Sequence, residues 1–98
     1  MAPAKLIYKR KTTYSDGTVV EMAIWELPHR SDERPHGLKY RLHCSKIDGS
    51  LIVRYDNESG KGDHRHYSNK EEVYQFKDVE TLIADFIRDI ATERLRKG

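Results

Sequence analysis

Apolar and polar residues alternate along parts of this 98-residue chain, and such a period of two predicts half-buried β-strands. The clearest example is LKYRLHCSK, in which Leu38, Tyr40, Leu42 and Cys44 point one way and the intervening side chains point the other. Alternation, or a high content of β-branched and aromatic residues, predicts four more strands. These are KLIYKRKTTY (5–14), TVVEMAIWEL (18–27), SLIVRYD (50–56) and EEVYQF (71–76).

Turn signals separate these strands. Ser15-Asp16-Gly17 and Asp48-Gly49 predict hairpins that join the first strand to the second and the third to the fourth. PHRSDERPHG (28–37) is longer than a minimal hairpin loop needs, so it is either functional or a plain connector.

The C-terminal part of the chain changes to a helical period. Val79, Leu82, Ile83, Phe86, Ile87 and Ile90 recur at a spacing that places them on one helical stripe. Asp78 is a suitable N-cap, and Glu80 in the first turn suits the helix dipole. The pattern predicts a helix over about residues 78–95.

Together these elements predict one α+β domain spanning residues 1–98. We expect an antiparallel β-sheet of about five strands with the C-terminal helix packed on one face, because the helix has a single apolar stripe. A second short helix, before or between the strands, is compatible with the pattern. The other sheet face, with Lys39, Arg41, His43 and Arg54, should remain in contact with water.

Composition narrows the class of protein. No apolar run approaches the roughly 18–20 residues of a membrane-spanning helix, and the N-terminus lacks the features of a signal peptide, so we expect a cytoplasmic protein. The single cysteine, Cys44, excludes an internal disulfide and is predicted to be buried. The net charge is only +2, but basic residues cluster at the N-terminus, between residues 29 and 46, and at the C-terminus. Such clusters suit contact with a phosphate backbone, and they equally suit a solubilising surface.

The stretch YDNESGKGDHRHYS, residues 55–68, carries the candidate chemistry. Its composition also suits a solvated loop. Alternatively, Gly60 and Gly62 would allow the GKG segment to present backbone N–H groups and Lys61 to an anion. His64 and His66 would project to one side if extended, but H-x-H alone is a weak zinc signal. A third ligand would have to come from Asp56, Glu58, Asp63 or His43, none of which has diagnostic spacing.

A metal-free nuclease would use the same residues differently. Histidine can act as base or acid near neutral pH, so His64 and His66 are the candidates for proton transfer. Asp56 and Asp63 would orient the imidazoles. The candidate phosphate- and RNA-binding residues are cationic: Lys61, Arg65, Arg41, Lys39 and Arg54. This hypothesis requires no metal and no cofactor.

The chain resembles the TumE-like family, toxin components of prokaryotic toxin–antitoxin pairs, over about residues 18–91. The resemblance rests on Tyr-Asp-Asn at 55–57, Gly-Lys-Gly-Asp-His-Arg-His at 60–66, Tyr-x-Phe at 74–76 and Leu-x-x-Asp-Phe at 82–86. It implies a bacterial or archaeal toxin, a helix-turn-helix antitoxin as partner, and RNA as the usual target of such proteins. It implies no particular reaction.

The leading hypothesis is therefore a toxin acting as a metal-independent endoribonuclease. Two alternatives remain open: a non-catalytic module that binds RNA or a protein through the basic face, and a metal-dependent nuclease using His64 and His66. A homodimer is also compatible with the sequence.

Overall fold

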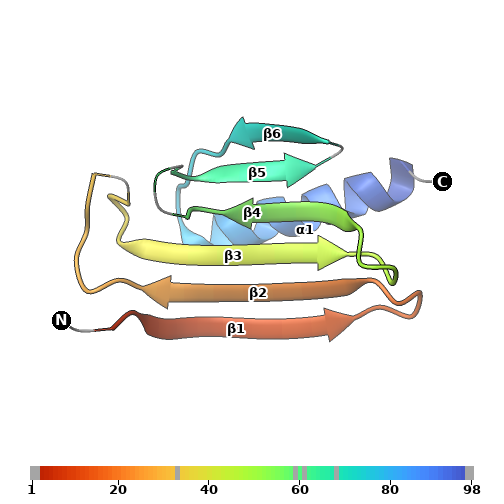
Figure 1. Cartoon of the computed structure of the whole chain (residues 1–98), viewed down its shortest axis with the longest axis horizontal. Coiled ribbons are helices and arrows are strands. Elements are labelled where there is room, and N and C mark those ends of the chain that lie inside the picture. Colours follow the sequence, from red (N-terminus) through yellow and green to blue (C-terminus); the bar gives the residue numbers. More distant parts are fainter. Residues whose placement is uncertain (1–2, 33, 59, 61, 68, 97–98) are drawn as a thin grey trace.

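The computed structural model describes residues 3–32, 34–58, 60, 62–67 and 69–96, and it contains one antiparallel sheet backed by one helix. Six strands follow one another across the sheet in chain order (Figure 1). They are β1 (Lys5–Thr13), β2 (Val19–Glu26), β3 (Leu38–Ser45), β4 (Leu51–Asp56), β5 (His64–Tyr67) and β6 (Lys70–Val73). The helix is α1 (Val79–Arg96). The predicted α+β architecture is confirmed.

The strand missing from the prediction is β5. Its sequence, HRHY, is polar on both sides of the alternation, so hydrophobic periodicity gave no signal for it. Its neighbour β6 begins and ends slightly earlier than the predicted 71–76. The second short helix that the pattern allowed is not present among the described residues.

Both predicted Asp-Gly hairpins are present. Gly17 and Gly49 have φ angles of 87° and 88°, a left-handed conformation that glycine adopts without a steric penalty. In each turn the preceding aspartate stabilises the loop: Asp16 accepts a hydrogen bond from the Thr18 N–H, and Asp48 accepts one from the Ser50 N–H. The residues within each turn therefore determine the conformation of these two hairpins.

The helix covers one face of the sheet behind β4 (Figure 1). Asp78 caps it as predicted, since its Oδ1 accepts a hydrogen bond of 2.7 Å from the Thr81 N–H. Leu82, Phe86 and Ile90 are buried against the sheet, whereas Ile87, predicted to share their stripe, is 41% exposed. The buried apolar residues are Val20, Met22, Ile24, Tyr40, Leu42, Cys44, Val53, Tyr55, Tyr74, Leu82, Phe86 and Ile90.

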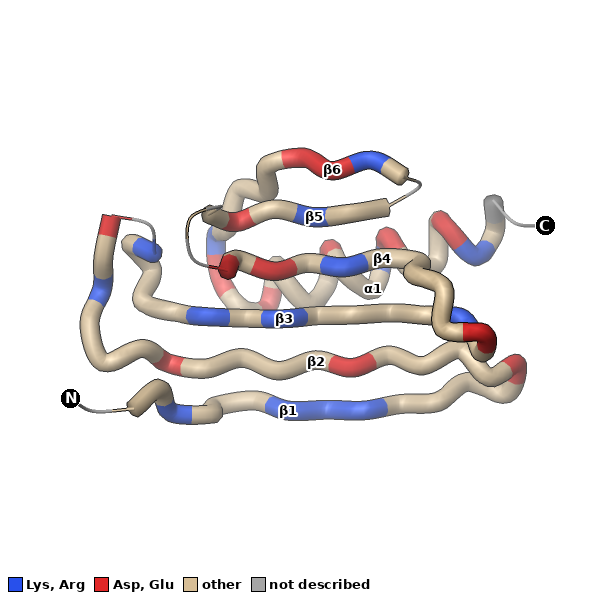
Figure 2. The backbone as a smooth tube through the Cα atoms, in the orientation of Figure 1, with Lys and Arg blue, Asp and Glu red and all other residues tan. Residues whose placement is uncertain are grey.

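Strand register divides the remaining side chains between two faces. The row Met22, Leu42, Tyr55, Arg65 and Glu72 runs across the sheet on the helix side. Figure 1 looks onto the opposite face, which the helix leaves uncovered and which we call the open face. Lysine and arginine are concentrated on β1 and β3, and acidic residues on β6 and parts of α1 (Figure 2). No helix in the described part of the chain is long and apolar enough to cross a membrane.

Candidate active site on the open face

Two parallel rows of side chains cross the open face, one residue from each strand. The first row is Lys9, Ala23, Arg41, Asp56, His64 and Val73. The second row is Lys11, Glu21, His43, Arg54, His66 and Glu71. Because directly opposed residues of antiparallel strands share a face, the register alone brings together two histidines, two carboxylates and Arg54 on β4, β5 and β6.

His64 is the buried member of this cluster, with 5% of its surface exposed. Its Nδ1 lies 2.9 Å from the Gly62 carbonyl oxygen, and its Nε2 lies 2.7 Å from Asp56 Oδ1. Both neighbours are acceptors, so each contact is favourable only when the facing nitrogen carries a proton, although the contact to Asp56 lacks hydrogen-bond geometry. Gly62 has a φ of 71°, and this turn directs its carbonyl back toward the ring.

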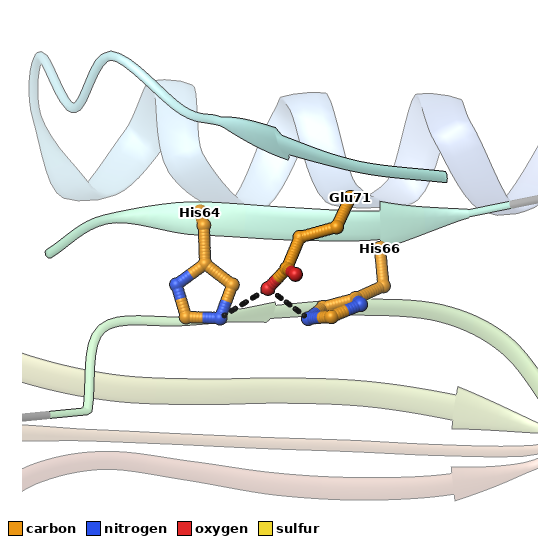
Figure 3. A group of neighbouring side chains, drawn as sticks. All are labelled: His64, His66 and Glu71. Carbon is orange, nitrogen blue, oxygen red and sulfur yellow. Dashed lines mark ion pairs between the residues drawn. The ribbon is translucent and has the colours of Figure 1, made fainter. Parts of the chain in front are cut away.

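His66 is more accessible and has different neighbours. Its Nε2 lies 3.0 Å from an Arg54 Nη. The same nitrogen lies 3.1 Å from Glu71 Oε2 (Figure 3). Burial lowers the pKa of His66, and the Arg54 guanidinium lowers it further, while Glu71 acts in the opposite direction. A neutral His66 can accept a hydrogen bond from Arg54 at Nε2, and the lowered pKa favours the neutral ring, which is the form that can act as a base.

The two imidazoles are held edge to face, with ring centroids 5.2 Å apart. Glu71 bridges them, because its Oε2 is 3.1 Å from His66 Nε2 and 3.5 Å from His64 Nε2. All three side chains project from β5 and β6 toward β4 on the open face (Figure 3). Their ligand atoms all lie within 4.8 Å of one another, so the same group could also hold a metal ion.

Arg54 connects the histidines to Asp56. Its Nε lies 3.1 Å from Asp56 Oδ2 while its Nη reaches His66, so one guanidinium contacts both rows. Asp56 and Arg54 were assigned from the sequence to orientation and phosphate binding, and both lie beside the histidines.

Comparison with known proteins gives this cluster a biological setting. The family model described as Toxin TumE matches residues 3–94. The chain belongs to the TumE toxin family. No curated protein and no solved structure matches it. The resemblance inferred from the 55–66 motif is therefore confirmed and extends over nearly the whole chain.

In this TumE-family chain the Tyr-Asp-Asn motif divides its residues among three tasks. Tyr55 is buried on the helix side and hydrogen-bonds to Asp89, whereas Asp56 points to the open face. Asn57 is buried, accepts a hydrogen bond of 3.0 Å from the Tyr40 N–H and donates one of 2.9 Å to the Leu38 carbonyl. Only Asp56 therefore belongs to the site.

Arg65, assigned from the sequence to phosphate binding, lies on the opposite face from the histidines. Its guanidinium hydrogen-bonds to Glu72, Tyr55 and Asp89, and so joins β4, β5, β6 and α1. Since residues 64, 65 and 66 alternate, an extended chain cannot place Arg65 beside both histidines.

Asp63 also lies apart from the two histidines that it was expected to orient. Its carboxylate is 2.9 Å from His36 Nε2, while His36 Nδ1 accepts a hydrogen bond from the Leu38 N–H and the ring packs on Phe76. Together with the hydrogen bonds from Arg34 to the Asn57 carbonyl, this pair ties the 28–37 loop to the end of β4.

The remaining assignments concern cations. Lys61 lies outside the described residues. Arg41 is opposite Asp56 in the first row, and Lys39 lies farther along β3 with its Nζ 5.6 Å from the centre of the Trp25 ring. Both are exposed on the open face. His43 lies between Arg41 and Arg54, and burial together with these cations lowers its pKa.

Glu71 is the site residue that sequence reasoning missed. It comes five positions after His66 and stands opposite it only because β5 and β6 form a tight hairpin. A sequence signal existed: two short polar segments separated by Ser68-Asn69, a typical turn composition.

Proposed function

We propose that this TumE-family chain is a toxin that cleaves RNA without a metal ion, using the His64–His66 cluster on the open face. The observation that carries the proposal is that the two histidines have different hydrogen-bond environments beside one guanidinium. His64 faces two acceptors, whereas His66 Nε2 faces a donor, the Arg54 guanidinium, as well as the Glu71 carboxylate. A base and an acid of this kind are what 2′-hydroxyl attack on a phosphodiester requires.

In the proposed reaction, neutral His66 removes the proton from the ribose 2′-hydroxyl, and the resulting oxygen attacks the adjacent phosphorus. The bond to the 5′-oxygen of the next nucleotide breaks, which leaves a 2′,3′-cyclic phosphate and a free 5′-hydroxyl. The 5′-oxygen takes a proton that originates at His64 and passes through Glu71, because Glu71 contacts His64 Nε2 and is about half exposed. Asp56 holds His64 in position.

Arg54 supplies the electrostatic part of the mechanism. A phosphate placed over β4 would draw the guanidinium away from His66 Nε2, which frees the lone pair that accepts the 2′-hydroxyl proton. The same guanidinium, with Arg41 in the neighbouring row, would stabilise the charge that develops on the phosphate oxygens.

RNA binding is supported by the rest of the open face. Lys9, Lys11, Lys39 and Arg41 lead from the histidines toward the β1 edge, and Trp25 offers a ring on which a base can stack. This surface also favours the alternative of a toxin that binds RNA without cutting it. In that case, replacing the histidines would leave toxicity intact and neutralising the lysines would reduce it.

The deciding experiment compares RNA cleavage by wild-type, His66→Ala and His29→Ala protein, purified identically and assayed with and without EDTA. His29 is an exposed histidine in the 28–37 loop and serves as the matched control. We expect cleavage by wild type and His29→Ala, unaffected by EDTA, a loss of at least about 100-fold in His66→Ala, and products with cyclic phosphate ends. Equal activity in all three preparations would reject the site, and loss of wild-type cleavage in EDTA would reject the metal-free mechanism.

The partner proposed for this toxin is a small helix-turn-helix antitoxin. A reading frame for such a protein beside this gene, and inhibition of cleavage by the purified product, are the expected findings. A neighbouring gene of another kind would count against this partner without affecting the cleavage assay.

A further inference from the structure

Three side-chain atoms of the kind that bind metal ions converge at the centre of the open-face cluster. Oε2 of Glu71 lies 3.1 Å from His66 Nε2 and 3.5 Å from His64 Nε2, and the three atoms all lie within 4.8 Å of one another. Two imidazole nitrogens and one carboxylate oxygen at these distances can surround one cation once His64 Nε2 gives up its proton.

The first histidine is already oriented as a metal ligand would be. Its Nδ1 lies 2.9 Å from the Gly62 carbonyl oxygen and donates a hydrogen bond to it, so Nε2 is the atom directed into the cluster. Metal-binding histidines are usually fixed in this way, because a hydrogen bond from the other nitrogen sets both tautomer and ring orientation. On His64, a metal ion would replace the Nε2 proton.

Asp56 gives an independent indication. Its side chain is only 8% exposed, and its Oδ1 has no hydrogen-bond partner of acceptable geometry among the described residues, although His64 Nε2 is 2.7 Å away. A buried carboxylate oxygen in this state is costly unless something else satisfies it. Because Oδ1 lies 2.7 Å from His64 Nε2, it can accept a hydrogen bond from a water bound to the metal beside that nitrogen.

We propose that His64, His66 and Glu71 form a binding site for one divalent transition-metal ion of the zinc class. Two imidazole nitrogens and one carboxylate suit zinc, whereas magnesium and calcium prefer oxygen ligands alone. The ligand atoms, all within 4.8 Å of one another, need only small side-chain rotations to surround an ion at about 2.0–2.2 Å. The positive charge of Arg54 opposes metal binding, so its Nη must move away from His66 when the ion binds. The contact of Arg54 Nε with Asp56 Oδ2 would then hold the guanidinium outside the metal site.

A consequence for activity rests on the proposed function. An ion on His66 Nε2 occupies the lone pair that would accept the 2′-hydroxyl proton, and it also removes the proton from His64. Metal binding and metal-free cleavage therefore exclude each other, so zinc is an inhibitor of the proposed nuclease.

The test uses protein stripped of metal with a chelator and titrated with Zn²⁺ against a chromophoric competitor, and separately with Co²⁺. The variants are His66→Gln and Glu71→Gln. Matched controls from the same face are His43→Gln and Glu21→Gln, which lie in the second row without joining the cluster. Circular dichroism on each preparation tests whether folding is retained. Glu71 is replaced rather than His64 because its side chain is accessible, so its substitution disturbs folding less.

We expect wild type and both controls to bind one Zn²⁺ per chain, and each ligand variant to bind at least about tenfold more weakly. Co²⁺ should give the intense visible bands of four- or five-coordinate cobalt, and these bands should be lost in the ligand variants. Absence of stoichiometric binding in wild type, or equal weakening in the controls, would overturn the metal site.

Cleavage assays on the same samples separate this inference from the proposed function. Inhibition of wild type by one equivalent of Zn²⁺ supports both. Activation by Zn²⁺ keeps the site but rejects the metal-free mechanism. Stoichiometric binding without cleavage under any condition keeps the site and rejects the nuclease.

Discussion

Two histidines separated by one residue occupy distinct chemical environments in this protein. His64 is buried between a carbonyl and a carboxylate, and His66 is more exposed beside a guanidinium. Their neighbours, rather than their identity, determine which of them can take up a proton and which can release one.

The influence of Arg54 on His66 can be measured directly. Replacing Arg54 with glutamine removes a positive charge that lowers the pKa of His66, so this pKa should rise. NMR titration of the imidazole resonances reports the change, and the acid limb of the cleavage rate should move to higher pH with it. Lys39→Gln, which removes a charge from the same face near Trp25, should leave His66 unchanged. An unshifted His66 in Arg54→Gln would contradict the contact.

Asn57 illustrates a motif residue whose importance is structural. Replacement by alanine leaves the Tyr40 N–H and the Leu38 carbonyl without partners inside the protein, so the free energy of unfolding should fall by about 2–3 kcal/mol. Urea denaturation measures this loss, and exposed Glu58→Ala should stay within about 0.5 kcal/mol of wild type. A destabilisation as large in Glu58→Ala would show that the effect is not specific to the amide.

At the level of elements, β5 connects the two faces of the sheet. Its even-numbered residues form the proposed site, and Arg65 between them links the sheet to α1 through Asp89. The proposed catalysis and the docking of the helix therefore depend on the same four-residue strand.

This division of tasks predicts opposite effects for two arginines. Arg65→Met removes the cation that Glu72 and Asp89 Oδ2 contact, while Arg88 remains 3.5 Å from Asp89 Oδ1, and it should cost about 2–3 kcal/mol of stability, less than for a fully buried pair. RNA affinity, measured well below the unfolding transition, should not change. Arg41→Met should leave stability within about 0.5 kcal/mol and weaken RNA binding, because its side chain is exposed on the open face. A loss of RNA affinity in Arg65→Met would place the nucleic acid elsewhere.

Some elements of this fold could be predicted from the sequence and others could not. The helix, the Asp-Gly hairpins and the polar face of β3 were predictable because periodicity, caps and turn residues act locally. The strand β5 was not, since a short strand lined with polar groups on both faces lacks an apolar pattern. Glu71 lies in the site without having been predicted there, whereas Asp63 and Arg65 were predicted there and lie elsewhere. These positions follow from strand register and alternation, which depend on how separate segments pair.

The whole molecule presents two unlike surfaces, a helix-covered side and an open side on which cations outnumber carboxylates from β1 to β4. Long-range attraction by such a surface would bring a polyanion to the sheet before any specific contact forms.

Binding of RNA should therefore depend on salt. In a cleavage-deficient His66→Ala background, Lys9→Gln/Lys11→Gln should weaken binding of single-stranded RNA and reduce the slope of log affinity against log salt by about 1.4, or 0.7 for each lost phosphate contact. Lys70→Gln/Lys77→Gln removes the same charge from positions outside the open-face rows and should leave the slope unchanged. Fluorescence anisotropy over a salt series gives both values, and equal slopes for the two double variants would exclude a path across β1.

The alternation of β5 also bears on how a gene of this kind can lose its activity. In-frame loss of the single codon for Arg65 would make the two histidines adjacent, and adjacent residues of a strand point to opposite faces. One imidazole would then face the helix, and α1 would lose its guanidinium anchor. A three-nucleotide deletion, which leaves the reading frame and every proposed proton-transfer residue intact, should thus abolish the proposed cleavage.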